Sequence, residues 1–358
     1  MITIGVDAHK SVHAAVALDE AGRELDRWRG PNSPQGWAAL AAWAAAHAAS
    51  CGAARQWGIE GAGHYGRGLA QHLLAGGETV YDINPRWTAQ ERQRARRPAK
   101  SDRLDARAVA LYLWREAATL PPLSAEDDTS VLDLLVTERE GALAEATRLR
   151  NQLHALLLPL DPQYKEHLPA LTTAAGIAAA EAYVGPGRTA LQQAQAASIR
   201  RLAQRLRLAT EQAADLERQI TARAQAGFSP LTQLKGIDLL TAGALAGLLG
   251  PGRRFGSDAQ VSAYAGVAPL EASSAGRVRH RLNRGGNRRL NAILYRMALT
   301  QLRCWPPAQD YVARRLREGK TKREAIRALK RYLMRAIWRL WQGCLWTHTT
   351  TPSCVQAA

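Results

Sequence analysis

The sequence predicts an α/β domain at the N-terminus, followed by a long helical region and a mainly α-helical C-terminal domain. Up to about residue 120, short apolar runs alternate with alanine-rich stretches, a pattern typical of a sheet covered by helices. Beyond that point apolar residues recur at helical spacing, and the last third of the chain is strongly basic. The 358 residues are enough for two or three domains with a sizeable buried core.

The first part of the chain has the order of strands and helices found in ribonuclease-H-like folds. Three strands are expected as an antiparallel meander, over residues 2–6, 12–17 and 25–28. Helix, strand, helix and strand are expected to follow, over residues 34–49, 56–59, 66–74 and 79–83. This order predicts a ribonuclease-H-like domain over residues 1–120.

The middle of the chain, residues 128–227, is predicted to be helical, after a proline-rich linker at residues 121–128. One apolar series runs from Leu132 to Leu156 at helical spacing. A second series has the alternating steps of four and three of a heptad seam, and consists of Leu202, Leu206, Ala209, Ala213, Leu216 and Ile220. Two such helices predict an antiparallel hairpin, a dimerising coiled coil, or a helical bundle within one protomer.

A third domain is predicted over residues 228–345, with a disordered tail at 346–358. Residues 234–246 resemble two small-residue helices joined by a glycine turn, which either aims N–H groups at a phosphate or forms a plain αα-hairpin. Between residues 276 and 340 there are 19 lysines and arginines against three acids. Several of these basic residues are therefore expected to contact phosphates.

The overall charge points to a polyanionic partner. The formal net charge is +17, with a pI near 10.4, which favours nucleic acid over a membrane surface because no run of about 18 apolar residues exists. The N-terminus is expected to be a strand rather than a signal peptide. The four cysteines have neither zinc-site nor disulfide spacing. We therefore expect a cytoplasmic protein with reduced thiols.

Four acidic residues are candidates for a metal site. Asp102 and Asp105 are three positions apart, so on a helix both carboxylates share one face. Asp7 and Glu60 each follow an expected strand, and the two strands are neighbours in a ribonuclease-H-like sheet. Four acids suit two Mg²⁺ ions about 4 Å apart. Taken singly, Asp102 could instead cap its helix and Asp7 could end a strand in a turn.

Several ordered motifs resemble a family of insertion-sequence transposases. The N-terminal segments GVDAHK, GIEGAGHYGRGLAQHL, INPRW and KSDRLDARAVA resemble the family's DEDD domain. The segment RFGSDAQVSAYAGVAPLEASSAGRVRHRLNRGGNRRLN, residues 254–291, resembles its C-terminal transposase domain. The resemblance implies an N-terminal RuvC-like domain, a coiled coil and a transposase domain carrying a nucleophilic serine. It also implies recombination of donor and target DNA, guided by a noncoding bridge RNA.

By this resemblance Asp7, Glu60, Asp102 and Asp105 match the metal-binding tetrad, for Mg²⁺ or in its place Mn²⁺. The nucleophile is expected at Ser274, with Ser273 as the alternative, because the chain has Ser-Ala-Gly where the family usually has Ser-Gly. The expected nucleic-acid contacts are Arg277, Arg279, Arg281, Arg284, Asn287, Arg288 and Arg289. A homodimer or homotetramer in the bacterial cytoplasm, at the nucleoid when bound to DNA, is also expected.

Two other functions fit the sequence. A RuvC-like structure-specific nuclease would need the four acids but neither serine, and would leave no bond between protein and DNA. A non-catalytic nucleic-acid-binding protein would need only the basic C-terminal region. The presence of all four acids argues against this last function.

Overall fold

The computed structural model describes residues 1–51, 54–93, 101–250, 255–271, 280–281, 283 and 285–349. The chain divides into two compact units. The N-terminal unit includes residues 1–127, and the C-terminal unit begins at Asp128.

The N-terminal unit contains a five-stranded sheet of order β3-β2-β1-β4-β5. Its strands are β1 (Ile2–Ala8), β2 (Val12–Leu18), β3 (Glu24–Pro31), β4 (Arg55–Glu60) and β5 (Thr79–Ile83). The first three strands pair antiparallel, whereas β4 pairs parallel with both β1 and β5. This is the ribonuclease-H-like arrangement that the sequence predicts, so that prediction is confirmed.

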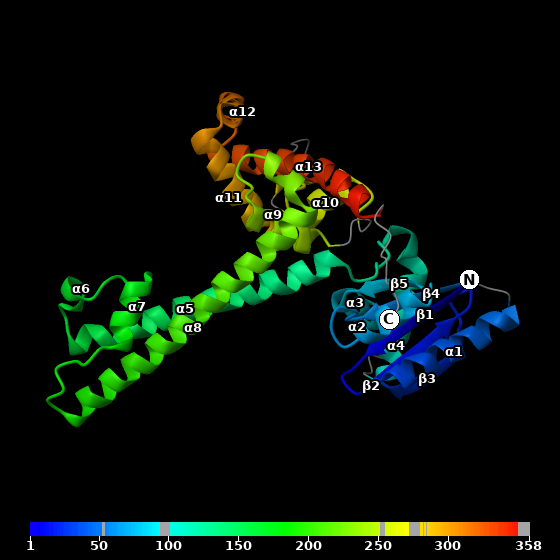
Figure 1. Ribbon diagram of the computed structural model, residues 1–358. Coiled ribbons are helices and arrows are strands. Elements are labelled where there is room, and N and C mark those ends of the chain that lie inside the picture. The colour runs from blue at the N-terminus through cyan, green and yellow to red at the C-terminus, as the bar shows by residue number, and fades with distance from the viewer. Residues whose placement is uncertain are drawn as a thin grey trace, which may run out of the picture. The chain divides into compact units, whose positions relative to one another are not determined.

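Helices cover both faces of the sheet (Figure 1). One face packs on α1 (Pro34–Cys51) and α2 (Arg67–Ala75) through a core that includes Ile4, Val6, Leu40 and Leu69. The other face packs on α4 (Asp102–Glu116), and a short 3₁₀ helix, η1 (Ala117–Thr119), follows it. The remaining helix of this unit is α3 (Pro85–Gln93), which packs against α4. Because side chains alternate along a strand, odd-numbered residues of β1 face α4.

A glycine in the central strand lets α4 approach the sheet closely. A Cβ at Gly5 would lie 2.2 Å from the backbone nitrogen of Ala110 and 2.4 Å from the carbonyl oxygen of Ala106. Any side chain there would push the helix away from the sheet. The distance between α4 and the ends of β1 and β4 therefore depends on this position.

The C-terminal unit begins with an antiparallel hairpin of two long helices, α5 (Asp128–Leu160) and α8 (Ala190–Gly227), joined through α6 (Tyr164–His167) and α7 (Ala174–Glu181) (Figure 1). In α8 the heptad residues Leu206 and Ala209 share a core with Leu149 and Leu153 of α5. Of the predicted alternatives, the antiparallel hairpin is observed within the chain.

The described elements in the rest of this unit are helices and a short two-stranded ladder, β6 (Leu270–Glu271) with β7 (His280–Arg281). Its elements are η2 (Ser229–Gln233), α9 (Leu239–Leu249), α10 (Asp258–Tyr264), α11 (Arg288–Cys304), α12 (Pro306–Arg317) and α13 (Lys322–Thr349).

The structure differs from two local sequence predictions, at residues 234–246 and at the start of the predicted disordered tail. The expected pair of helices at 234–246 is wrong, because a 3₁₀ helix and a turn at Gly236, with φ of 93°, precede the single helix α9, which Asp238 caps. The helix α13 continues to Thr349, and the remainder of the predicted tail lies outside the described residues. None of the described helices has both the length and the apolarity that a bilayer crossing needs.

Candidate active site

Strand pairing places Asp7 and Glu60 side by side at one edge of the sheet. The two residues are register partners at the ends of the parallel strands β1 and β4. Their strand neighbours Val6 and Ile59 belong to the core on the α1 and α2 face. By alternation, both carboxylates therefore lie on the opposite face, which α4 covers.

The first turn of α4 supplies the other two acids. Ser101 caps the helix, its side-chain oxygen accepting a hydrogen bond from the Leu104 N–H at 3.3 Å. Asp102 and Asp105 occupy the first turn, where the helix dipole favours negative charge. Asp105 is buried with 7% exposure, whereas the Asp102 side chain is 47% exposed.

The cluster perturbs the titration of Asp7. Its pKa is raised from 3.8 to about 6, chiefly by burial, with the negative charges of Asp105 and Glu60 also raising it and His9 lowering it. The ordinary expectation for a single carboxylate that ends a strand is a solvated side chain with an unshifted pKa. Several carboxylates are instead held together in a buried place, and their mutual repulsion opposes ionisation.

His9 lies between two of the acids. Its Nε2 lies 3.0 Å from Oδ2 of Asp7 and 3.9 Å from Oδ1 of Asp102. Ligand atoms of Asp7, His9 and Asp102 all lie within 4.8 Å of one another, as a shared metal ion requires. Sequence reasoning gave His9 no role, although it is part of the motif GVDAHK; its two-residue separation from Asp7 was the available signal.

Two further residues orient the acids. The Thr88 hydroxyl, at the start of α3, donates a hydrogen bond of 2.8 Å to Oε2 of Glu60. The guanidinium of Arg29, on β3, lies 3.7 Å from Oδ2 of Asp102. Neither residue was singled out from the sequence, because both are distant along the chain from the carboxylates they contact.

The cluster fits a hard divalent cation. Carboxylate oxygens are the ligands that Mg²⁺ and Mn²⁺ prefer, and His9 adds one nitrogen. A cation placed among Asp7, Glu60 and Asp105 would relieve the repulsion that raises the Asp7 pKa. Of the four predicted acids, Asp7 and Asp102 lie close enough, with His9, to share one metal ion, while Glu60 and Asp105 act on Asp7 through their charge. Metal binding by all four acids stays a prediction.

The structure assigns different environments to the residues expected to contact nucleic acid. Asn287 caps α11, accepting from the Leu290 N–H at 3.0 Å and donating to the Tyr264 hydroxyl at 2.8 Å. Arg288 is exposed and forms no ion pair with a described carboxylate. Arg289 lies 3.3 Å from Asp133 and 2.9 Å from Glu140, both on α5. Its charge is thus balanced within the protein, which makes Arg289 less suited to bind phosphate than the exposed Arg288; its contact with nucleic acid stays a prediction.

Other predicted residues lie outside the described part of the chain. These are Ser273, Ser274, Arg277, Arg279 and Arg284. Arg281 lies in β7, where only its backbone is described.

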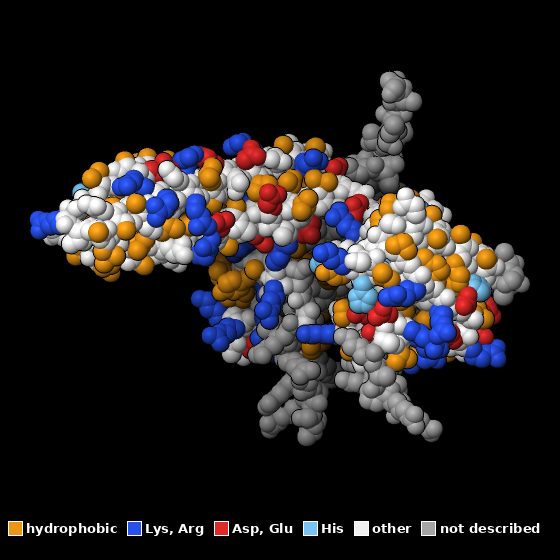
Figure 2. Space-filling view, turned by 90° about the horizontal axis from the view of Figure 1, so that it is seen from below, with side chains coloured by type: hydrophobic (Ala, Val, Ile, Leu, Met, Phe, Trp, Pro, Cys, Tyr) orange, Lys and Arg blue, Asp and Glu red, His pale blue; other side chains and the backbone are white. Residues whose placement is uncertain are grey.

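Positive charge on the helical hairpin is largely paired. Figure 2 shows blue and red side chains interspersed along this part of the molecule. The hairpin arginines Arg205, Arg207 and Arg218 each lie within 3.1 Å of a carboxylate. The hairpin is therefore less suited to bind a polyanion than a surface with unpaired cations.

Two transposase family models match the chain. One, of the DEDD domain of IS110 elements and described as "Transposase", matches residues 4–162, which include Asp7, Glu60, Asp102 and Asp105. The other, described as "Transposase IS116/IS110/IS902 family", matches residues 229–313. Together the two models cover more than half of the chain.

Curated relatives extend the similarity. The "Insertion element IS110 uncharacterized 43.6 kDa protein" of Streptomyces coelicolor is 29% identical over 303 residues, 73% of this chain and 75% of that protein. The "Insertion element IS116 uncharacterized 44.8 kDa protein" of Streptomyces clavuligerus is 23% identical over 385 residues, 95% of this chain and 94% of that protein.

A solved structure, "T. thermophilus RuvC in complex with Holliday junction substrate", aligns with 34% of this chain and 99% of its own, at 16% identity and a TM-score of 0.28. The fold of the N-terminal unit rests on its own strand order.

Proposed function

The chain belongs to the IS116/IS110/IS902 family of transposases, and from this premise we propose that it cuts and rejoins DNA through a covalent phosphoserine intermediate. In this proposal Asp7, Glu60, Asp102 and Asp105 hold Mg²⁺, and Ser274, or alternatively Ser273, is the nucleophile. A noncoding bridge RNA selects the donor and target DNA, and the protein works as a homodimer or homotetramer. The RNA and the serine come from the family resemblance stated above.

One observation carries the nuclease part of the proposal. Asp7 is buried, lies in register with Glu60, and has its pKa raised to about 6 by burial and by the charges of Asp105 and Glu60. Repulsion among these buried carboxylates lowers the stability of the fold, so a purely structural role does not explain it. Perturbed pKa values of this kind are typical of functional sites.

The residues of the site have distinct roles in this proposal. The metal, when bound, would supply positive charge at the scissile phosphate and at the oxygen that leaves it. Asp7 and Glu60 fix the position of the metal because each ends a paired strand, and Thr88 orients the Glu60 carboxylate. His9 holds Asp7 by a 3.0 Å contact and so limits the rotation of its carboxylate. The Asp102 side chain is 47% exposed against 10% for Asp7, so Asp102 is the more accessible of the two to a substrate.

The serine accounts for rejoining without an external energy source. Its hydroxyl oxygen bonds to phosphorus while one phosphodiester P–O bond breaks; the serine proton passes to solvent or a neighbouring base, and the departing DNA oxygen takes up a proton to become a hydroxyl. The new phosphoserine ester replaces the ester bond that was lost. A DNA hydroxyl can then reverse the step on another strand, so that strands are exchanged and resealed.

Hydrolysis of DNA junctions without a covalent intermediate is the second candidate function. The acid cluster favours it because Asp7, His9 and Asp102 are close enough to share a metal ion, and a metal-dependent hydrolase needs no serine when water is the nucleophile. The two candidates differ in one product, the bond between protein and DNA.

A denaturing gel tests the choice between them. The full chain is co-expressed with the noncoding DNA that flanks its gene, and is incubated with donor and target plasmids, with Mg²⁺ or with EDTA. Wild type is run beside Ser274→Ala and Ser273→Ala. The expected result is a detergent-resistant protein–DNA adduct that requires Mg²⁺ and disappears in one serine variant.

Cleavage without an adduct, unchanged in both serine variants, would replace the recombinase with the hydrolytic nuclease. Cleavage in EDTA would reject the metal site. Omitting the flanking noncoding DNA tests the RNA: full activity without it would contradict guidance.

A further inference from the structure

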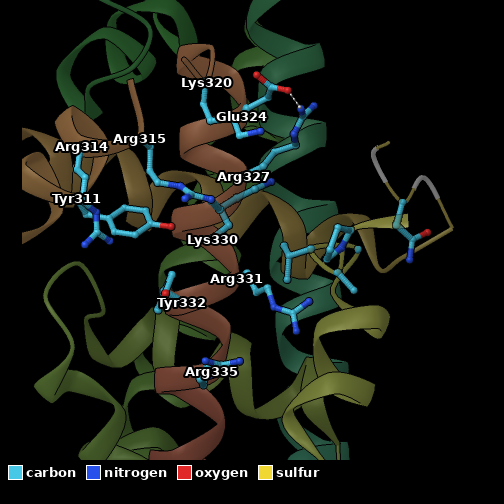
Figure 3. Close-up of a pocket in the computed structure, with 16 residues that line it drawn as sticks. Tyr311, Arg314, Arg315, Lys320, Glu324, Arg327, Lys330, Arg331, Tyr332 and Arg335 are labelled. Atoms are coloured by element: carbon cyan, nitrogen blue, oxygen red, sulfur yellow. Dashed lines mark ion pairs between the residues drawn. The ribbon is translucent and has the colours of Figure 1, made fainter. Parts of the chain in front are cut away.

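A basic pocket lies along α13 in the C-terminal unit. Its volume is about 690 Å³, within the range of small-molecule and cofactor sites. Residues of α12 and α13 line it together with residues 266–269 and Asn283. Figure 3 shows Tyr311, Arg314 and Arg315 of α12 beside α13. All described lining residues belong to the same unit, so the pocket is complete within it.

The lining carries a large excess of positive charge. Among the described lining residues there are seven lysines and arginines and one acid, Glu324. Four of the seven pair with carboxylates: Arg314 and Arg315 with Glu318, Arg327 with Glu324 as the dashed line in Figure 3 shows, and Arg335 with Asp258. The other three, Lys320, Lys330 and Arg331, form no ion pair within 4 Å of a carboxylate in the described part of the chain, although Lys320 acts on Glu324 and Arg331 on Asp258 at longer range.

Lys330 is the only one of these three residues that is buried. It is only 6% exposed, and its ammonium group donates to the side-chain oxygen of Asn291 at 2.7 Å. Burial, and secondly the charge of Arg327, lower the pKa of Lys330. A buried cation with only a neutral partner costs free energy that a bound anion would recover.

Two tyrosines add aromatic surface to this cationic lining. Tyr311 and Tyr332 are in edge-to-face contact, with ring centroids 5.1 Å apart and an interplanar angle of 69°. Tyr332 is 54% exposed although it lines the pocket, and the Arg335 guanidinium lies 5.9 Å from its ring centroid. An exposed aromatic ring among cations is the arrangement on which proteins stack unpaired bases.

We propose that this pocket binds one nucleotide of an unpaired nucleic-acid strand, with its phosphate near Lys330 and Arg331 and its base against Tyr332. The proposal deepens the proposed function and rests on it in one respect, that the substrate is nucleic acid. Unpaired strands arise both in a guide RNA and in DNA opened for strand exchange, and the two share this phosphate and base chemistry.

The pocket lies next to residues that flank the predicted nucleophile in the sequence. Pro269 and Asn283 both line it, and these residues flank the segment of the sequence that carries Ser273 and Ser274. A strand held in the pocket would therefore lie beside both ends of the segment expected to supply the nucleophile.

Fluorescence anisotropy of the full chain tests the proposal, in EDTA so that no strand is cut. The probes are labelled 12-nucleotide strands of oligo-dT and oligo-rU, and an abasic strand of the same length. Tyr332→Ala should weaken binding of oligo-dT, oligo-rU or both about tenfold, and leave the abasic strand within about twofold, because base stacking alone is lost. Tyr332→Phe should retain binding.

Lys330→Met tests the phosphate contact. It should weaken all three probes and reduce the slope of log affinity against log salt concentration by about 0.7, the value of one phosphate on a single strand. The melting temperature of the ligand-free variant should not fall, because an unneutralised buried charge is removed. Arg317→Gln, on α12 but not in the pocket lining, is the matched control and should change each affinity by less than about twofold.

The DNA and RNA probes identify the strand, since the one that responds to Tyr332→Ala is the ligand. Unchanged binding in Tyr332→Ala, or an equal loss on the abasic strand, would overturn the nucleotide pocket. These binding results are independent of the adduct gel. A covalent adduct can form even if the pocket binds no nucleotide, and the pocket can bind a nucleotide even if no adduct forms.

Discussion

The two units of this protein each gather like charges, but of opposite sign. At the sheet edge Asp7, Glu60 and Asp105 crowd together, and the pKa of Asp7 rises to about 6. Along α13, seven basic residues line one pocket, and the pKa of buried Lys330 falls. In both places burial is the largest cause, and a neighbouring like charge acts in the same direction.

This difference in sign matches the two partners of the proposed reaction. A cluster of carboxylates is complementary to a metal cation, whereas a cluster of lysines and arginines is complementary to a phosphate backbone. The overall charge of +17 predicts only the second partner. Local structure, rather than composition, thus reveals a negatively charged site within a basic protein.

The largest expected effect is on strand cleavage, through the acid cluster. Asp7→Asn should lower the cleavage rate at least about 1000-fold, because a metal ligand and its charge are both lost. Glu138→Gln, an exposed acid on α5, removes one negative charge elsewhere and should leave the rate unchanged. A time course on labelled DNA with Mg²⁺ measures both. Wild-type rates in Asp7→Asn would exclude the acid cluster from catalysis.

The next effect concerns the approach of α4 to the sheet. Gly5→Ala should lower the free energy of unfolding by about 3 kcal/mol, because the new methyl group would lie 2.2 Å from the Ala110 nitrogen. It should also reduce cleavage, since Asp102 and Asp105 move with α4. Gly63→Ala is the control, as a Cβ there meets nothing within 4 Å. Urea unfolding compares the two, and equal stability would contradict the close approach.

A smaller effect is the pH dependence that Asp7 contributes. Its folded pKa is raised from 3.8 to about 6, so its stabilising contribution is complete below pH 3.8 and is lost as the pH rises to about 6. At about 1.4 kcal/mol per pKa unit, the full shift is about 3 kcal/mol. In EDTA at neutral pH, Asp7→Asn should be more stable than wild type, because the asparagine carries no buried charge. The expected gain is roughly 2 kcal/mol rather than the full shift, because the replacement also weakens the contact with His9.

Thermal melts at several pH values measure this difference. Mg²⁺ should stabilise wild type more than Asp7→Asn, because only wild type retains the full ligand set. A variant less stable than wild type in EDTA would mean that Asp7 is not under electrostatic strain.

The smallest effect separates two adjacent arginines. Arg289→Gln should cost about 1 kcal/mol of stability through its lost ion pairs with Asp133 and Glu140, with little change in nucleic-acid affinity. Arg288→Gln should leave stability unchanged and reduce affinity a few-fold. Thermal melts and nucleic-acid binding curves of both variants measure these effects. A loss of affinity in Arg289→Gln without a loss of stability would instead support the predicted phosphate contact of Arg289.

The positions of the four acids could largely be expected from the sequence. The apolar runs that end at Asp7 and Glu60 predict strands, and the spacing of Asp102 and Asp105 predicts one helical face. The role of His9 was not predicted, because the distance from its Nε2 to Asp102 depends on how α4 packs against the sheet. The same holds for Thr88, which contacts Glu60 from 28 residues away.

The sequence by itself determined the local elements of this protein: the strands, the helical periods, the heptad seam and the clustering of basic residues near the C-terminus. These depend on residues only a few positions apart, so their pattern is legible along the chain. Tertiary structure decided that the seam packs on α5 of the same chain, that Arg289 is neutralised while Arg288 is not, and that α12 and α13 enclose a pocket. Each of these depends on which distant segments approach one another, and long-range packing alone fixes that.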